Sequence, residues 1–254
     1  MSGLEARLRV PLLQRGDFSE VLAAPWASLS AREMAERPVY LVRDGKVMLG
    51  DLFDISGEST GQIRFVGDLS HADRIGAGLA GGHAVVEGNA GNEAGMAMSG
   101  GALEILGDAG SRAGAAPLGH KKGMTGGELI VHGSAGPEAG ADMRRGLLAI
   151  AGAAGSQTGL GMIAGTVVVF GAAGPDTGLW SKRGTVVALG QITPPATYVY
   201  ACTYNPVHLR LLLTRLRESY DLPVRGRHIT GPFRRYSGDM AELGKGEILV
   251  WTAA

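Results

Sequence analysis

The sequence has little cysteine, few aromatic residues and no net charge, and each of these deficits excludes a class of protein. The single cysteine, Cys202, cannot form an internal disulfide, and no cluster of thiolates exists for zinc or an iron–sulfur cluster. Lysine plus arginine is 24 and aspartate plus glutamate is 24, so the neutral chain offers no bulk attraction to nucleic acid or to an anionic membrane. No apolar run reaches the ~18 residues of a membrane span. These features predict a cytoplasmic protein.

Glycine is abundant instead, and its positions reveal an internal repeat. The 42 glycines among 254 residues are too many for a helical bundle, and they do not follow the three-residue period of collagen. Most of the repeat spacings equal the 19 residues from Gly82 to Gly101, while the next unit carries seven additional residues. Segments that begin with Gly, alternate apolar residues and return to Gly start at Gly61, Gly82, Gly101, Gly127, Gly146, Gly165 and Gly184.

Each unit has the pattern of one short β-strand followed by tight corners. The third and fifth residues are apolar, as in Leu129 with Val131 and Val167 with Val169, which is the alternation of a strand with one buried face. Further glycines recur at three places in the unit, where we expect corners that need positive φ or leave no room for a Cβ atom. These corner glycines are Gly88, Gly91, Gly95, Gly107, Gly110, Gly114, Gly133, Gly136, Gly140, Gly152, Gly155, Gly159, Gly171, Gly174 and Gly178.

A unit of this length cannot bury a core alone, but stacked copies can pair each strand with the next one, ~4.8 Å away. The sequence therefore predicts a mainly β fold, a single-stranded parallel β-helix over residues 61–191. A flexible linker would not keep this register over six units. The glycine spacings also disfavour a left-handed hexapeptide helix, and the corners lack the aspartates of a calcium-binding nonapeptide roll.

The segments before and after the repeat are expected to cover its ends. Residues 1–60 are predicted to form an N-terminal α+β cap, in which Ser30 and Glu33 have the spacing of a helix capping box. Residues 192–254 are predicted to form a strand and helix cap, whose helix begins at Pro206 and has leucines on one face. Such caps would protect the exposed strand edges from aggregation.

The sequence carries no motif typical of catalysis or metal binding. The histidines occupy different places in the repeat, so we expect solvated or capping residues rather than a metal site. No His-Glu-x-x-His motif, Gly-x-Ser-x-Gly elbow or Walker loop occurs, and Gly-x-Gly combinations precede strands instead of the helix that a dinucleotide fingerprint requires. No catalytic, cofactor-binding or metal-binding residue is therefore assigned. The six histidines are His71, His83, His120, His132, His208 and His228.

One local concentration of positive charge remains in this neutral chain. Arg144-Arg145 and Lys182-Arg183 occupy the same two places in units that lie two repeats apart, about 10 Å along the stack. The inserted residues bring Lys121-Lys122 just before the matching place in an earlier unit. Solvated corners that keep the repeat soluble would explain this pattern, and so would a docking strip for an acidic partner or a polyanionic ligand tail. We name these residues the basic stripe: Lys121, Lys122, Arg144, Arg145, Lys182 and Arg183.

Several segments resemble a known protein family. The glycine units between 61 and 190, PVYLVRDGKVMLGDLFDISG before them, and NPVHLRLLLTRL and RRYSGDMAELGKGEILVW after them are together similar to the C subunit of formylmethanofuran dehydrogenase. The resemblance covers the chain from about residue 38 onward. The repeat alone also resembles the C-terminal domain of the large subunit of glutamate synthase, a right-handed β-helix, so the flanking segments distinguish the two families.

The resemblance implies a right-handed β-helix that serves as a non-catalytic structural subunit. In methylotrophic bacteria, the related formyltransferase/hydrolase complex moves a formyl group from tetrahydromethanopterin to a methanofuran analogue and releases formate. The implied partners are the other subunits of that complex, which handles methanofuran or its polyglutamylated analogue, while no cofactor is expected on this chain. The richness in Ala, Gly and Arg, with few Lys, favours this bacterial setting.

Three alternatives stay open. The chain could be the C subunit of the archaeal molybdenum or tungsten formylmethanofuran dehydrogenase, which reduces CO2 onto methanofuran. It could be a β-helix module like that of glutamate synthase, with a function of its own. A metal-dependent enzyme built on the repeat is the third.

Overall fold

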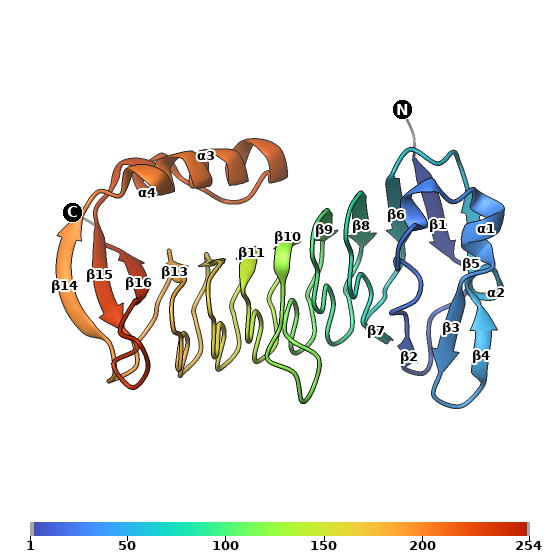
Figure 1. The fold of residues 1–254 in the computed structure, drawn as a ribbon. Helices are drawn as coiled ribbons and strands as arrows, with labels where there is room; N and C mark the ends of the chain where they lie inside the picture. The colour runs from blue at the N-terminus through green and yellow to red at the C-terminus, as the bar shows by residue number, and fades with distance from the viewer. Residues whose placement is uncertain (1–2, 253–254) are drawn as a thin grey trace.

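The alternating apolar residues of the glycine units form one strand in each unit, and these strands lie side by side (Figure 1). The computed structural model describes residues 3–252. Neighbouring strands run parallel, and partners such as Leu148 and Val167 are one unit apart in sequence. The strands are β6 (Gln62–Val66), β8 (His83–Glu87), β9 (Ala102–Ile105), β10 (Thr125–Val131), β11 (Arg145–Ile150), β12 (Thr166–Val169) and β13 (Thr185–Ala188).

The same sheet continues beyond the repeat at both ends. At one end β1 (Leu4–Leu8) pairs in parallel with β6 and antiparallel with β5 (Phe53–Ser56). At the other end β16 (Gly246–Trp251) pairs in parallel with β13, and β15 (Phe233–Gly238) and β14 (Val199–Tyr204) follow in antiparallel order. The result is a 12-stranded sheet with the order β14-β15-β16-β13-β12-β11-β10-β9-β8-β6-β1-β5.

The predicted fold class, a single-stranded right-handed parallel β-helix, is therefore wrong. The regular strands form one mixed sheet of 12, mostly parallel, and strands from both terminal segments belong to it. Away from this sheet, each unit forms turns and single bridges, such as Ala90 with Ala109 and Ala135 with Ala154, instead of strands. The alternation of apolar residues predicts one strand in each unit, but it does not reveal which distant segments join the sheet or in which direction they run.

The N-terminal segment adds short helices and three strands of a second, smaller sheet, whose fourth strand comes from the first glycine unit. This sheet has four strands in the order β4-β3-β2-β7, namely β4 (Gly45–Met48), β3 (Pro38–Leu41), β2 (Gly16–Asp17) and β7 (Ala72–Asp73). The helices are α1 (Ala31–Ala35), α2 (Leu49–Leu52) and the 3-10 helix η1 (Trp26–Ser28). The predicted capping box of α1 is confirmed, because the Ser30 hydroxyl accepts from the Glu33 N–H and the Glu33 carboxylate accepts from the Ser30 N–H at 2.8 Å.

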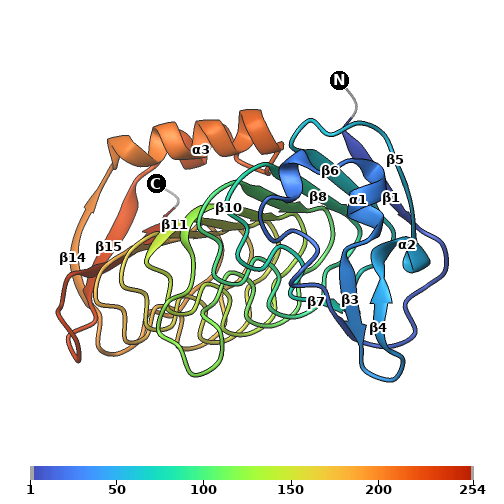
Figure 2. The ribbon, with the colours of Figure 1, turned by 45° about the vertical axis from the view of Figure 1, so that its right-hand side comes forward.

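The C-terminal segment lays a helix over the middle of the large sheet. α3 (Val207–Tyr220) begins directly after Pro206, which confirms the predicted helix start, and α4 (Gly226–Thr230) follows it. Figure 2 shows α3 lying over the strands of the repeat. Its leucines cover the apolar side chains that the strands direct away from the interior of the repeat. The helix residues are Leu209, Leu213 and Leu216, and the sheet residues include Ile130, Leu147, Val168 and Val187.

The corners require glycine for two different reasons. At the place occupied by Gly95, Gly114, Gly140, Gly159 and Gly178, φ lies between 65° and 80°. At the other two places, the neighbouring unit approaches too closely for a side chain. A Cβ atom on Gly110 would lie 2.6 Å from the Asn92 side-chain oxygen, and one on Gly133 would lie 2.2 Å from the Asp108 carboxylate.

Polar side chains connect successive units at their corners. The Asn89 side-chain oxygen accepts from the N–H of Asp108 at 2.9 Å, and the Asp108 carboxylate accepts from the N–H of Ser134 at 2.7 Å. The Ser134 hydroxyl accepts in turn from the N–H of Ala153 at 3.1 Å. These bonds satisfy corner N–H groups that no strand partner reaches. Among residues 3–252, no helix is long and apolar enough to cross a membrane.

Candidate functional site

Part of the basic stripe surrounds an open cavity of about 460 Å³ on the repeat. The cavity brings together Lys122, Arg144, Arg145 and Arg183, and these four side chains are exposed. None of the residues that line it is acidic. We call it the basic cavity, and its lining is Lys122, Thr125, Arg144, Arg145, Ile163, Ala164 and Arg183.

The register of the repeat explains why these cations converge. Thr125 at the start of β10 pairs with Arg145 at the start of β11. The N–H of Ile163 donates to the Met143 carbonyl and that of Lys182 donates to the Met162 carbonyl, each at 2.8 Å. These bonds place residues 144–145, 163–164 and 182–183 in three successive units. The middle unit contributes Ile163 and the small Ala164, which leaves room between the cations on either side.

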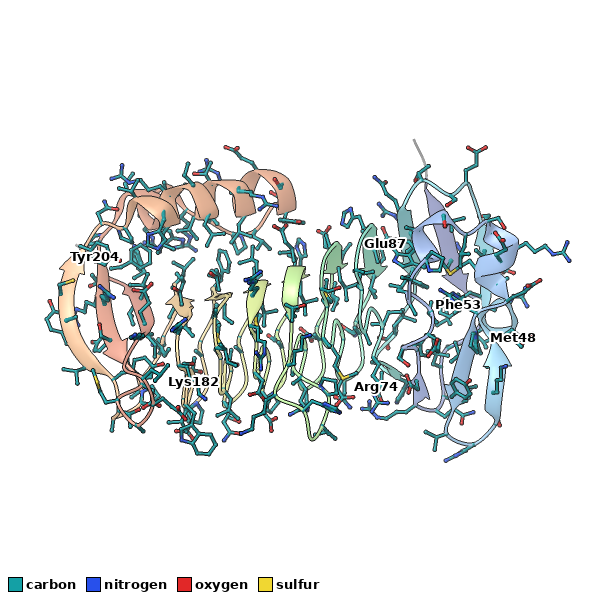
Figure 3. The ribbon with its side chains drawn as sticks, in the orientation of Figure 1. Met48, Phe53, Arg74, Glu87, Lys182 and Tyr204 are labelled. Carbon is teal, nitrogen blue, oxygen red and sulfur yellow. The ribbon has the colours of Figure 1, made fainter. Side chains whose placement is uncertain are left out.

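The other two residues of the basic stripe do not line the cavity. The Arg144 guanidinium donates two hydrogen bonds to the Lys121 carbonyl, at 3.2 and 3.0 Å, so the backbone of the insertion positions Arg144. Lys182 lies at the lower edge of the molecule (Figure 3), where its Nζ is 3.9 Å from Glu242 Oε2. The stripe predicted from the sequence therefore contains four cavity cations, one backbone anchor and one ion-paired lysine.

The electrostatics of this region are positive but not free of acidic groups. Asp142 is half-buried; burial raises the pKa of its carboxyl group, while Lys121, Arg112 and Arg144 act in the opposite direction. One carboxylate cannot neutralise four cations. Because guanidinium groups stay protonated at physiological pH, the cavity is suited to binding carboxylates or phosphates rather than to proton transfer.

A second cluster, which the sequence analysis missed, lies on the outer face of β8, β9 and β10. The Glu104 Oε1 atom is 2.7 Å from His132 Nε2, and its Oε2 atom is 3.5 Å from His83 Nε2. The two histidines occupy different places in the repeat, as noted from the sequence, yet both reach the carboxylate between them. Burial alone would raise the pKa of Glu104, but the hydrogen bond from His132 and the nearby His83 imidazole outweigh it and lower the pKa to about 2.

This histidine cluster gives no sign of a metal centre. Within residues 3–252, no group of three or more His, Cys, Asp or Glu side chains is arranged to hold a metal ion. Searching the sequence for an acidic residue between two histidine-bearing strands would have found the cluster, whereas the search for stacked histidines did not.

A ladder of alternating charges connects the small sheet to the repeat. Arg74, Glu93, Arg112 and Glu138 occupy equivalent corners, all with φ between 58° and 64°. Arg74 pairs with Glu93 at 2.7 Å, and Arg112 pairs with Glu93 at 3.6 Å and with Glu138. Asp17 of β2 joins the ladder through Arg74 at 2.9 Å. Since each charge faces an opposite charge, we assign this charge ladder a structural role.

The sequence matches no model of a known protein family and no curated protein. A solved structure is nevertheless similar over nearly the whole chain. It is a chain of the crystal structure of the formyltransferase/hydrolase complex (FhcABCD) from Methylorubrum extorquens in complex with methylofuran. The identity is 34%, the match covers 98% of this chain and 100% of that chain, and the TM-score is 0.79.

The fold and this comparison define a class of mainly β proteins with a glycine-rich repeat. The chain belongs to the family that includes this chain of the formyltransferase/hydrolase complex. The resemblance to that complex noted from the sequence is confirmed at this level. The assignment to the C subunit and the relation to the dehydrogenase stay predictions.

Proposed function

We propose that this chain is the C subunit, a structural subunit of a formyltransferase/hydrolase complex of one-carbon metabolism. In that role it binds other subunits, and those subunits move a formyl group from tetrahydromethanopterin to a methanofuran analogue and release formate. The observation that carries the proposal is the similarity, at 34% identity and over both full lengths, to a chain of such a complex. The segments GDLFDISG and GDMAELGKGEI, outside the repeat, support the C subunit as the particular one.

The basic cavity serves this role by holding carboxylates. Both an acidic surface of a neighbouring subunit and the polyglutamate tail of a methanofuran analogue present carboxylates in a row. Arg144 and Arg145 lie two units away from Arg183, so these cations are about 10 Å apart along the stack, with Ile163 and Ala164 between them. Exposed cations bind such groups weakly one by one, and several together bind them in a salt-dependent way.

The subunit assignment is tested by assembly and turnover. The tagged chain is co-expressed with the other three subunits encoded in its native source, and the purified material is assayed for formyl transfer and formate release. We expect a stable complex that is active, and no turnover by the chain alone. Turnover by the isolated chain would overturn the structural role, and failure to join the complex would overturn the assignment.

The role of the basic cavity is tested by charge reversal. In the double variant Arg145→Glu/Arg183→Glu, we expect at least tenfold weaker binding of the complex or of a synthetic polyglutamate at low salt. The difference should shrink as ionic strength rises, because these charges are exposed. Lys46→Glu, on β4 of the small sheet, is the matched control for charge reversal at an exposed site. Unchanged binding in both variants contradicts a docking role for the cavity.

A further inference from the structure

The glycine unit that starts at Gly165 and the β15–β16 loop together expose three large apolar side chains. Trp180, Met240 and Leu243 are each 54% exposed. The Trp180 N–H donates to the carboxylate of Asp239 at 2.8 Å, and Met240 follows Asp239 directly, so the loop packs against the corner that carries the tryptophan. Figure 1 shows this loop beside the end of the repeat, and Figure 3 labels Lys182 in the same region. We call these three residues the apolar tip.

Trp180 occupies a backbone conformation that disfavours large side chains. Its φ is 60°, in the left-handed region. The same corner of earlier units holds Gly78, Ala97, Asp142 and Gly161, with φ between 55° and 66°. An aromatic residue in this region is a genuine outlier, and its ring here is largely in water. Neither its backbone nor its burial explains the tryptophan, so a contact outside this chain is the better explanation.

The loop that carries the rest of the apolar tip is held rigidly. The Asp239 side chain is fully buried and accepts from the N–H groups of Trp180 and Ala241, each at 2.8 Å. The Asp239 carbonyl accepts from the Gly244 N–H at 2.9 Å. Because these bonds already order the loop, a partner would not have to do so, which lowers the entropic cost of binding.

Cations border the apolar tip on the side of the basic cavity. Lys182 and Arg183 follow Trp180 closely in sequence and are exposed, and Arg183 also lines the cavity. The neighbouring carboxylates are Glu242, which lies 3.9 Å from Lys182, and the exposed Asp176. Tryptophan, methionine and arginine are enriched at the centres of protein interfaces. The combination indicates a protein partner rather than a small anion.

We propose that Trp180, Met240 and Leu243 anchor a second protein subunit of the complex, which presents an apolar pocket bordered by carboxylates. The proposal rests on the proposed function, because it takes another subunit of that complex as the occupant. A second copy of this chain is a poorer occupant. It would bring Lys182 and Arg183 of one copy towards the same cations of the other, and like charges in contact disfavour association.

The experiment compares assembly of the wild-type chain with two variants. In Trp180→Gly, glycine replaces tryptophan at a corner where Gly161 is the natural residue one unit earlier. The variant should therefore fold with an equal or higher melting temperature, while its Kd for the remaining subunits rises at least tenfold. Met240→Ala/Leu243→Ala should weaken binding similarly. Leu211→Ala, at a 76% exposed position of α3, is the matched control and should bind like the wild type.

Each outcome decides a separate point. If the wild type does not assemble with the other subunits, both the proposed function and the anchor proposal are overturned. If the wild type assembles and both tip variants bind with unchanged Kd, the anchor proposal alone is overturned. If sedimentation shows that the isolated wild type dimerises and Trp180→Gly does not, the occupant is a second copy, and the proposal is overturned in that form.

Discussion

Single residues at the corners are limited both by the backbone conformation and by the side chains that pack against them. Gly140 and Gly159 both have φ of 71°, and a Cβ atom on them would lie 2.9 and 2.8 Å from the sulfur atoms of Met143 and Met162. The corner that carries the charge ladder also has left-handed φ, but it holds side chains instead of glycine. There Arg74 and its equivalents keep left-handed φ at a backbone cost of roughly 1–3 kcal/mol each, and Gln157 and Asp176 of the next two units have the same φ.

Replacing one of these glycines separates the cost of φ from the cost of crowding. In Gly140→Val, we expect the free energy of unfolding to fall by roughly 2–5 kcal/mol, because the branched side chain meets both penalties. Gly78→Val is the control, since Gly78 has φ of 66° but nothing within 4 Å of its Cβ position. The Gly78→Val variant should lose only the part of the free energy of unfolding that comes from the backbone conformation. Denaturant titration measures both, and equal losses would show that packing against Met143 is unimportant.

The Glu104 cluster predicts a pH dependence of stability. The pKa of Glu104 is depressed from 4.5 to about 2, so its ionised form stabilises the folded chain above pH 4.5. That contribution is lost as the pH falls from 4.5 towards 2. Glu104→Gln should therefore lower the melting temperature at pH 7, and the difference from wild type should vanish near pH 2. The exposed Glu20→Gln is the control, and a constant difference across this range would contradict the assignment.

At the scale of elements, α3 is held by apolar packing along its length and by polar bonds near its end. The Glu128 carboxylate of β10 lies 2.6 Å from the Arg215 guanidinium and accepts a hydrogen bond from the Tyr220 hydroxyl. Burial, followed by this bond, raises the pKa of Tyr220, so its hydroxyl remains a donor. The last turns of the helix therefore depend on one residue of the sheet.

Removing that residue should loosen the end of α3 without unfolding the chain. In Glu128→Ala, we expect the amide protection of residues 216–220 to fall, because the free energy of local opening at the end of α3 decreases by about 1–3 kcal/mol. Hydrogen exchange measured by mass spectrometry would detect this change. Glu218→Ala, which removes an exposed carboxylate on the helix itself, is the control. Equal protection in the two variants would show that Leu213 and Leu216 hold the helix alone.

Local signals made several elements predictable, and distant pairings did not. The capping box at Ser30 and the helix after Pro206 depend on neighbouring residues, so the sequence alone predicts them. β1 and β16 pair with segments far along the chain, as Leu4 does with Ile63 and Glu247 with Thr185. No periodicity marks such partners, which is why the mixed sheet was not predicted.

The features of the candidate site also divide into those that local sequence spacing predicts and those that depend on distant segments. The repeat correctly placed Arg144-Arg145 and Lys182-Arg183 in register, because register follows from sequence spacing. It could not show that Arg144 binds the Lys121 carbonyl, since the path of the insertion is irregular. The apolar tip was missed because its loop comes from a distant hairpin. The sequence offered one signal of the apolar tip: Trp180 stands at a place where the other units have small or polar residues.

At the scale of the whole molecule, both edges of the large sheet end in antiparallel strands, β5 at one end and β14 at the other. The C-terminal strands cover the edge of β13, and α3 covers the outer apolar face of the repeat. An uncovered parallel edge next to an uncovered apolar face would be an aggregation hazard.

Truncation tests this arrangement. A chain that ends after residue 191 should be mostly insoluble, because it exposes the edge of β13 together with Ile130, Leu147 and Val168. The soluble fraction and light scattering, compared with the full-length chain under the same conditions, measure the effect. A monodisperse soluble monomer would show that the repeat does not need its C-terminal cover.

The parallel strands in the middle of the sheet also fix the distance between the two ends of the molecule in steps of one unit. Within the repeat, the strand of each unit pairs only with the strands before and after it, and the terminal strands pair only with the outermost ones. Adding or deleting one whole unit between β6 and β10 would therefore change the separation of the two ends by a single increment of ~4.8 Å. A change between β10 and β13 would also disturb the contacts that α3 makes with Glu128 and Ile130. The number of glycine units therefore sets the distance between two proteins that bind at opposite ends of the chain.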